Sequence, residues 1–480
     1  MTDAVLWLAL VVFLPLFGSL LVPLFGGRNH VVARRLALVL GGATLFSAIK
    51  LALLDAGAGP TELLLDLPLG LGLHLQADYL AVFMALASSS ISFIILLYSI
   101  GYITHYKHQT EYFMMVVLFL GGMMGLVFSS NLVWLFVFWE ITGLCSWRLV
   151  GFFRGERETL KASKTFLITV FGALCMLLGI VAIYVSTGSF DMADLRGHIL
   201  PGYVVALFLL GIFAKSAQLP LSTWLPDAGV APSPVTALLH AAVLVKIGVY
   251  AYARFFLATF QIGPEWNSIV AILVGASALI SAGAALTETD IKRIIAYSTI
   301  SQIGFIFLGL STGISAGNYV GAAGALLYIL MHGVAKAGLF LCAGIIEHKT
   351  HTKDITKMGG LLRVMPVTAV SFAFCAFSVM GIPPFGGFWS KYMVIAGAAS
   401  FGNSLITGMF LLGAVLTVIY LMRVFYAVFM GEPRQYAAGE GHGSMVGSVA
   451  VLGFASLLLG VFINYPAKLV DDVCRQLINL

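Results

Sequence analysis

The segment FAKSAQLPLSTWLPDA, residues 213 to 228, is the most informative part of the sequence about the fold. It places Lys215 inside an apolar segment and follows it with Pro220 and Pro226. Proline removes a backbone donor and clashes with the preceding turn, so a membrane helix must break here. Backbone N–H and C=O groups that lose their helical hydrogen bonds inside the membrane are tolerated only where protein or a water-filled cavity surrounds them. We therefore expect the helix break to lie in the interior of the protein, next to Lys215. An ionisable side chain within a membrane span is by default a candidate functional residue.

The composition is that of a polytopic membrane protein. Of the 480 residues, 60% are hydrophobic and 10% are charged, against about 25% charged residues in soluble domains. Apolar runs long enough to cross a hydrocarbon core of ~30 Å recur along the whole length. The first, from Ala4 to Phe25, has no basic n-region and no clear cleavage site, which predicts a retained helix. The sequence therefore predicts an all-α fold without a soluble domain.

Hydropathy predicts about fourteen spans, at approximately 4 to 25, 31 to 54, 78 to 100, 111 to 130, 132 to 153, 161 to 186, 203 to 219 with a broken continuation, 234 to 260, 266 to 286, 292 to 311, 321 to 346, 364 to 399 broken at 381 to 387, 404 to 430 and 445 to 464. The second break, MGIPPFGGFWSKYM at 380 to 393, places Pro383 and Pro384 close to Lys391. Paired interrupted helices indicate an inverted repeat with a site at the bilayer midplane.

The breaks divide the chain into four parts. We expect three N-terminal spans in residues 1–110, a first five-helix repeat in 111–260 with its break near 219–228, a second in 266–430 with its break near 381–387, and a last span with a short tail in 445–480. Lys215 precedes its break whereas Lys391 follows its own, which predicts different tasks for the two halves.

Charged residues in the loops predict the topology. Basic residues gather in alternate loops, and by the positive-inside rule these loops are cytoplasmic. Both termini are then extracytoplasmic, in a multi-pass protein of the cell inner membrane. The basic loops contain Arg28, Arg34, Arg35, Lys107, Arg154, Arg157, Lys161, Lys164, Lys292, Arg293, Lys349, Lys353, Lys357 and Arg363, and the opposite loops contain Asp55, Glu62, Asp66, Asp191, Asp194 and Arg196.

One acidic residue, Glu140 in WEITGLCSWRLVGF at 139 to 152, is predicted to lie inside a span. An isolated carboxylate there would be neutralised or paired. Lys215 is the expected partner. A static ion pair is the alternative, although buried pairs often add no net stability. Arg148, nearer the cytoplasmic end of the same span, is expected to reach the membrane interface.

Four lysines, Lys215, Lys246, Lys336 and Lys391, are predicted to lie well inside spans. Burial can lower the pKa of a lysine by several units, so that its protonation comes to depend on a nearby carboxylate. Such lysines suit a proton relay. The alternative for each is an ammonium that snorkels to the interface.

Two histidines are predicted in the same interior. His332 lies four residues before Lys336, hence on one helix face, which suits a relay. His240 lies six residues before Lys246, about 120° around the helix from it and ~9 Å along it. The alternative for His240 is a core histidine without a transport role.

The chain carries no sign of redox or nucleotide chemistry. Its sequence has no Walker loop, dinucleotide fingerprint, haem-attachment motif or metal-ligand cluster. Its five cysteines form no C-x-x-C pair, and four lie in apolar segments as small core residues. We expect no cofactor, no metal and no nucleic-acid partner.

Several motifs resemble the antiporter-like subunits shared by respiratory complex I, Mrp-type cation/proton antiporters and complex-I-like membrane-bound hydrogenases. They are WEITGLCSWRLVGF, KSAQLPLSTWLPDA, PSPVTALLHAAVLVKIGVYAYAR at 232 to 254, TETDIKRIIAYSTISQIGF at 287 to 305, MHGVAKAGLF at 331 to 340 and FGGFWSK. The resemblance runs from about Tyr112 to Lys391. It implies fourteen spans, with spans four to eight and nine to thirteen as inverted repeats.

The resemblance also implies roles. Glu140 and Lys215 match a pair whose making and breaking passes a signal; Lys246 with His240 matches the centre of span 8; His332 and Lys336 match a relay in span 11; and Lys391 matches the group that hands protons toward the exit. Where the largest complex I member usually carries Arg-Val-Gly-Asp, residues 170 to 173 read Val-Phe-Gly-Ala. Having both His240 and Lys246 looks more like the Mrp or hydrogenase branches.

These observations predict a proton-translocating membrane subunit of a larger energy-converting complex. Its partners would be other membrane subunits and the lipid bilayer, and its cargo protons, with Na⁺ as the alternative. The complex would be a proton-translocating oxidoreductase that resembles an NADH:quinone oxidoreductase or a hydrogenase. This chain would be a subunit of it that pumps ions and carries no redox centre. Two rival functions are a subunit of an Mrp-type Na⁺/H⁺ antiporter and a secondary solute transporter; a passive scaffold would leave the buried charges without purpose.

Overall fold

A computed structural model of the chain describes residues 3–27, 29–54, 61–65, 72–313, 319–432, 434 and 439–478. Twelve of the described helices are long and apolar enough to cross a membrane. Two shorter apolar helices, Gly202–Ser216 and Pro366–Met380, precede the two expected breaks. The predicted all-α polytopic membrane fold is confirmed. Arg28, Asp55 and Asp66 of the topology argument lie outside the described residues.

The first six spans are unbroken and follow the hydropathy closely. Polar residues set several ends: Asp78 accepts a hydrogen bond from the Ala81 N–H at the start of the third span, and Gly188 ends the sixth with a left-handed φ of 76°. The spans are α1 (Asp3–Gly26), α2 (His30–Leu54), α3 (Tyr79–Tyr102), α4 (Gln109–Phe128), α5 (Leu132–Val150) and α6 (Glu156–Thr187), with a 3₁₀ turn, η2 (Ile103–His105), after α3.

The first break is a folded segment in which Ala217, Gln218 and Trp224 are buried, whereas Pro220 and Thr223 are exposed. Helix α7 (Gly202–Ser216) ends at Ala217, and the chain turns through α8 (Trp224–Asp227) and η3 (Ala228–Val230). The Trp224 indole donates to the Ala214 carbonyl at 2.9 Å, and the Gln218 amide donates to the carbonyls of Ser216 and Ile300. Side chains thus take up backbone groups that the break frees.

Span 8, residues Ser233–Thr259, is irregular in a way that hydropathy does not reveal. It consists of α9 (Ser233–Ala237), a π-helical turn η4 (Leu238–Ala242), α10 (Leu244–Ala253) and a second π-helical turn η5 (Arg254–Thr259). π-Helical turns are rare and occur frequently at functional sites.

The second half contains the other break. The chain leaves the helix at Gly381, whose φ is 82°, and re-enters it at Gly386. The elements are α11 (Glu265–Thr287), α12 (Ile291–Thr312), α13 (Val320–Thr350), η6 (Ile355–Lys357), η7 (Leu361–Arg363), α14 (Pro366–Met380), α15 (Gly386–Ser400), α16 (Ser404–Phe425), η8 (Tyr426–Met430) and α17 (Gly443–Val461).

Two elements were not predicted. Strands β1 (Thr61–Leu65) and β2 (Leu73–Ala77) form an antiparallel hairpin between α2 and α3. The expected short tail is instead helix α18 (Asn464–Ile478), which packs against α3 and α13. Its Gln476 accepts from the Tyr79 N–H at 2.9 Å.

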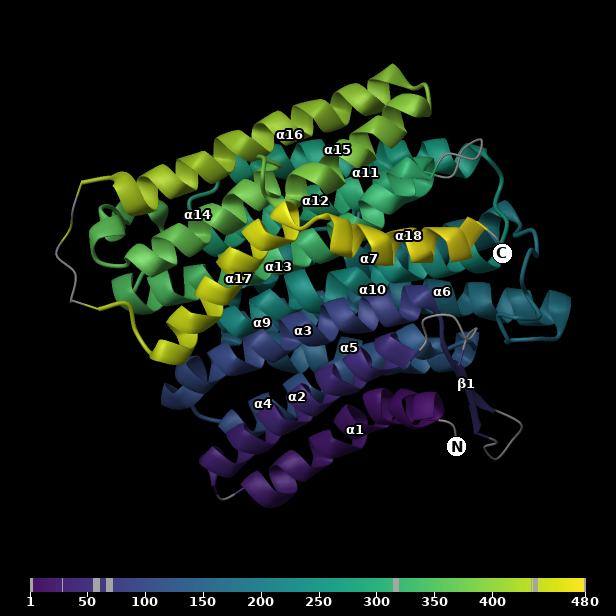
Figure 1. Cartoon of the computed structure of the whole chain (residues 1–480), viewed down its shortest axis with the longest axis horizontal. Coiled ribbons are helices and arrows are strands. Elements are labelled where there is room, and N and C mark those ends of the chain that lie inside the picture. The colour runs from purple at the N-terminus through teal and green to yellow at the C-terminus, as the bar shows by residue number, and fades with distance from the viewer. Residues whose placement is uncertain are drawn as a thin grey trace.

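The helices lie side by side, with α1 at one edge of the molecule and α16 at the opposite edge (Figure 1). Both ends of the chain and β1 lie at the same end of the long helices (Figure 1). The spans buried almost throughout are span 8, α12 and α13. These central spans carry most of the expected relay residues.

Candidate functional site

All four expected lysines are buried, with side chains between 0% and 4% exposed, so none of them snorkels to the surface of this chain. None forms an ion pair with a carboxylate of the described residues. A buried ammonium without a counter-ion is costly in an apolar interior. The contacts that each lysine makes instead define the candidate site.

Lys215 lies in the last turn of α7, beside α5. Its Nζ donates to the Trp139 carbonyl at 3.1 Å and lies 5.5 Å from the Trp139 ring centroid. Glu140 is half-buried, less enclosed than predicted. A Cβ atom at Gly143 would lie 3.1 Å from the Lys215 ammonium and 4.0 Å from a Glu140 oxygen. The two charges therefore face the same glycine, but the described residues hold no closed ion pair between them.

Lys246 and His332 join span 8 to α13. The Lys246 Nζ lies 2.9 Å from Nδ1 of His332. The sequence predicted that His332 and Lys336 share one face of a helix, and both do lie on α13 four residues apart. Their polar atoms turn to different neighbours, because His332 contacts Lys246 whereas Lys336 contacts α12.

His240 is placed by the π-helical turn η4. It is fully buried, and its ring centroid lies 4.3 Å from that of Phe340. Neither ring nitrogen makes a hydrogen bond with the described residues. A core histidine is usually hydrogen-bonded when buried, so its environment is not that of an ordinary structural histidine.

Lys336 and Lys391 occupy the second half. The Lys336 ammonium donates to the Ser298 hydroxyl at 2.6 Å and to the Ile295 carbonyl at 3.1 Å. The Lys391 ammonium has no hydrogen-bond partner among the described residues and lies 4.7 Å from the Phe305 ring centroid. Aromatic faces attract a cation but cannot take up its proton. Lys391 is therefore the lysine held by the weakest set of partners.

A buried ion pair that the sequence analysis missed ties α3 to span 8. Arg254 donates to both carboxylate oxygens of Asp78, at 2.5 and 2.8 Å, and to the Tyr250 hydroxyl at 2.9 Å. The predicted third span begins at Asp78, and an acidic residue at the start of a helix is common. Lys246, Tyr250 and Arg254 are spaced four residues apart in the sequence. This spacing places polar side chains on one face of span 8 and could have indicated the ion pair.

Asp227, at the end of α8, anchors the first break at its basic, predicted cytoplasmic side. It contacts Lys161 at 3.4 Å, Lys164 at 2.7 Å and Arg293 at 3.1 Å. Burial alone would raise its pKa, but the Lys164 hydrogen bond and the charges of Lys161 and Lys164 outweigh burial and hold the pKa of Asp227 below its usual value. The carboxylate thus links α6 to α12.

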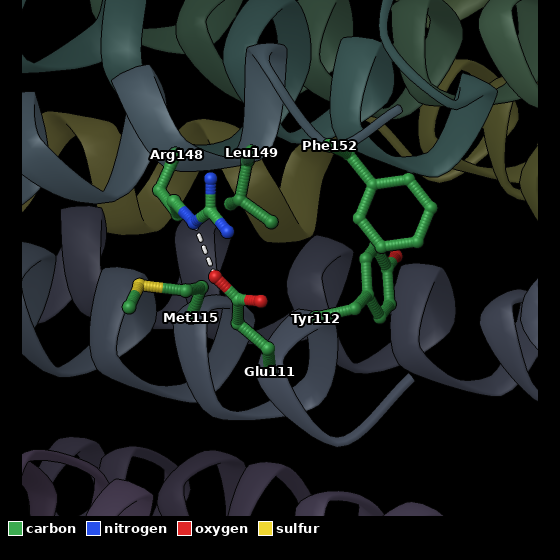
Figure 2. Close-up of a pocket in the computed structure, with 6 residues that line it drawn as sticks. All are labelled: Glu111, Tyr112, Met115, Arg148, Leu149 and Phe152. Atoms are coloured by element: carbon green, nitrogen blue, oxygen red, sulfur yellow. Dashed lines mark hydrogen bonds and ion pairs between the residues drawn. The ribbon is translucent and has the colours of Figure 1, made fainter. Parts of the chain in front are cut away.

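Arg148 forms an ion pair with Glu111, which lies in the first turn of α4. Figure 2 shows Arg148 of α5 and Glu111 of α4 pointing toward each other across a small pocket that Met115 and Leu149 also line. Arg154 donates to the other Glu111 oxygen at 2.6 Å. This cluster belongs to the fold of spans 4 and 5 and contacts none of the relay lysines in the described residues.

No group of three or more His, Cys, Asp or Glu side chains within the described ranges could hold a metal ion. The contacts of the expected relay residues form two clusters, Lys246 with His332 and Lys336 with Ser298.

Two family models match the chain. The one described as NADH:quinone oxidoreductase/Mrp antiporter, TM, matches residues 129–417, and the one described as NADH-Ubiquinone oxidoreductase (complex I), chain 5 N-terminus, matches residues 67–113. The first covers every expected relay residue.

Curated relatives share part of their length with this chain. A Bacillus subtilis relative named as a Na(+)/H(+) antiporter subunit is 37% identical over 371 residues, 71% of this chain and 46% of the relative. The NAD(P)H-quinone oxidoreductase chain 5 of Picosynechococcus sp. is 34% identical over 388 residues, 75% of this chain and 57% of the relative. The chain thus spans about half the length of these relatives.

Solved structures share the whole fold. A chain of the Mrp complex from Dietzia sp. superposes with a TM-score of 0.91 at 22% identity, covering 99% of this chain and 98% of that chain. A chain of the membrane-bound sulfane sulfur reductase, an archaeal respiratory membrane complex, gives 0.90 at 25% identity, covering 98% and 97%. The arrangement of spans described above is therefore a recurrent one.

Proposed function

Because the chain belongs to the NADH:quinone oxidoreductase/Mrp antiporter family of transmembrane proteins, we propose that it is a proton-translocating subunit of a multi-subunit energy-converting membrane complex. One observation carries the proposal: four lysines are buried in the spans without a carboxylate partner among the described residues. Stability does not explain such groups, since each is costly to bury. A path for protons does.

In this mechanism each buried amine takes up and releases a proton in turn. A proton from the cytoplasmic side reaches the Lys246–His332 pair, moves to Lys336 and leaves past Lys391. Glu140 and Lys215 form the control point: they face each other across Gly143 without closing. Movement of one charge against 100 mV requires about 2.3 kcal/mol, and closing a pair of charges to ~4 Å at an effective dielectric of 20 yields about 4 kcal/mol.

The proposal includes an orientation and an internal repeat. With the basic loops in the cytoplasm, the hairpin and both ends of the chain lie outside the cytoplasm, in keeping with their position at one end of the helices (Figure 1). Residues 111–260 and 266–430 would be inverted five-helix repeats. Each contains one span broken near a lysine, α7 with α8 and α14 with α15.

The partners would be further membrane subunits. The relatives include an NAD(P)H-quinone oxidoreductase chain and a Na(+)/H(+) antiporter subunit, so two kinds of complex are candidates for the assembly that contains this chain. Exchange of Na⁺ for protons is therefore the second candidate function. A solute transporter is disfavoured because its midplane site would present groups for a substrate, whereas His332, Lys246 and Lys336 contact one another or the helices around them.

Transport by the intact complex in proteoliposomes tests the proposal. We expect Lys215→Ala and Lys246→Ala each to abolish proton movement, followed with a pH-sensitive dye, while Lys107→Ala, an exposed control, leaves it unchanged. Repeating the assay with and without Na⁺ separates the two candidates. Normal proton yield from either buried variant would overturn the assignment.

A further inference from the structure

A network of uncharged polar side chains lies between Lys336 and Lys391 and has no role in the mechanism above. It is built from three helices. Ser298 and Gln302 lie one turn apart on α12, Tyr328 faces them from α13, and Tyr420 reaches in from α16. All four side chains are fully buried.

The first part of the network extends from Lys336. The Lys336 ammonium and the Tyr420 hydroxyl both contact the Ser298 hydroxyl, at 2.6 and 2.7 Å. Tyr420 also lies 3.3 Å from the Thr417 hydroxyl. Hydroxyl groups both donate and accept hydrogen bonds, so a proton that leaves Lys336 can advance through Ser298 to Tyr420 and Thr417 as each hydroxyl gains one hydrogen and gives up its own.

The second part of the network adjoins Lys391. The Tyr328 hydroxyl donates to Oε1 of Gln302 at 2.6 Å, and the Tyr328 ring centroid lies 5.8 Å from the Lys391 ammonium. Within the described part of the chain, Gln302 is the one side chain that hydrogen-bonds to both parts, because its Nε2 also contacts Thr417 at 3.1 Å and Tyr420 at 3.5 Å.

The side-chain amide of Gln302 holds the two parts of the network together by hydrogen bonds, but it cannot pass protons between them. Its nitrogen only donates and its oxygen only accepts hydrogen bonds, so it cannot receive a hydrogen on one side and release another from the same atom as a hydroxyl does. Turning the amide over exchanges the two atoms and leaves this property unchanged. The hydroxyl chain from Lys336 therefore ends at Gln302.

We propose that Gln302 is an insulating and positioning residue: in the arrangement above it prevents protons from passing directly between Lys336 and Lys391, so the transfer from Lys336 to Lys391 requires this arrangement to change. The inference rests on the proposed function, in which Lys336 takes protons from the cytoplasmic side and Lys391 releases them outside. A pump whose inner and outer sites are joined by an unbroken chain lets protons flow back down their gradient. An amide at the junction holds Tyr328, Thr417 and Tyr420 in place while keeping the chain broken.

Passive proton flux tests this role. The parent complex, Gln302→His and Gln302→Leu are reconstituted in proteoliposomes, a pH step is imposed with the membrane potential clamped, and flux is read with an internal dye in the absence of the driving reaction. An imidazole accepts at one nitrogen and donates from the other and so relays protons, whereas leucine fills the volume without relaying. We expect several-fold faster flux in Gln302→His and parental flux in Gln302→Leu.

A third variant assigns the path of the leak. Adding Lys336→Ala to Gln302→His removes the donor to Ser298 and is expected to restore parental flux. The inference is overturned if Gln302→His is as tight as the parent, if Gln302→Leu leaks equally, or if the leak survives the loss of Lys336. Failure of the proposed function appears elsewhere, as normal coupled transport by Lys215→Ala, and does not alter the passive flux of the Gln302 variants.

Discussion

The buried pair of Asp78 and Arg254 gives a prediction that depends only on the fold. Both side chains are less than 10% exposed, and the guanidinium binds both carboxylate oxygens. Asp78 also caps α3 by accepting from the Ala81 N–H at 2.8 Å. Asp78→Asn retains the size of the side chain and a good capping oxygen, so it removes the negative charge almost alone.

The expected loss follows from the geometry. Two unit charges ~4 Å apart at an effective dielectric of 20 interact by about 4 kcal/mol. Removing one partner of a buried pair typically costs about 3–5 kcal/mol, because the other charge is left uncompensated. We expect Asp78→Asn to lower the free energy of unfolding by about 3–4 kcal/mol. Tyr250→Phe, which removes one hydrogen bond to Arg254, should cost about 1 kcal/mol.

Unfolding by SDS in mixed micelles, followed by tryptophan fluorescence, measures these differences. The double variant Asp78→Asn with Arg254→Met removes both charges and should recover most of the stability, since a buried pair replaced by neutral groups is often neutral. The reasoning is refuted if Asp78→Asn unfolds like the parent, or if the double variant is less stable than Asp78→Asn alone.

Three further changes test single contacts. Gly143→Ala places a methyl group 3.1 Å from the Lys215 ammonium; coupled transport should fall although unfolding is unchanged or slightly harder, because alanine favours helix by about 1 kcal/mol. Gly387→Ala would put its Cβ 1.8 Å from the Ser378 carbonyl oxygen, so the second break should be destabilised by roughly 1–3 kcal/mol in the SDS assay. The pKa of Asp227 lies below its usual 3.8, so the contribution of its charge to stability, roughly 1 kcal/mol, is present above pH 3.8 and lost as the pH falls through the lowered pKa. Asp227→Asn should therefore unfold more easily than the parent at pH 7, and the difference should narrow as the pH falls below 3.8.

The spans could be predicted because lipid imposes a simple requirement on them. A segment must be long and apolar to cross the bilayer, and the predicted third span, 78 to 100, matches α3 at Tyr79–Tyr102 within two residues. The hairpin was missed because five-residue strands are too short to stand out in a leucine-rich loop. Helix α18 was missed because its charges exclude it from any count of spans, while its buried Val470 and Val473 hold it against the bundle.

The relay residues could be named but their contacts could not. A lysine in an apolar run is conspicuous because it is expensive, whereas a serine or tyrosine there is common. Ser298, Gln302 and Tyr420 therefore resembled core residues in the sequence. The π-helical turn around His240 changes the helical register, so the spacing of six residues from Lys246 could not say which neighbours each side chain meets.

The two broken helices set their lysines in opposite environments, and this bears on the direction of transport. Lys215 is the penultimate residue of α7, at the end where a helix carries partial negative charge, and a backbone carbonyl accepts its hydrogen bond. Lys391 lies in the second turn of α15, nearer the end of partial positive charge, over an aromatic ring and without an acceptor among the described residues. An ammonium is therefore held more firmly at the first break than at the second. In the proposed mechanism, a chain of amines whose last member holds its charge least firmly favours release at that member, so the order of helix, break and lysine in each half would favour the exit of protons at Lys391.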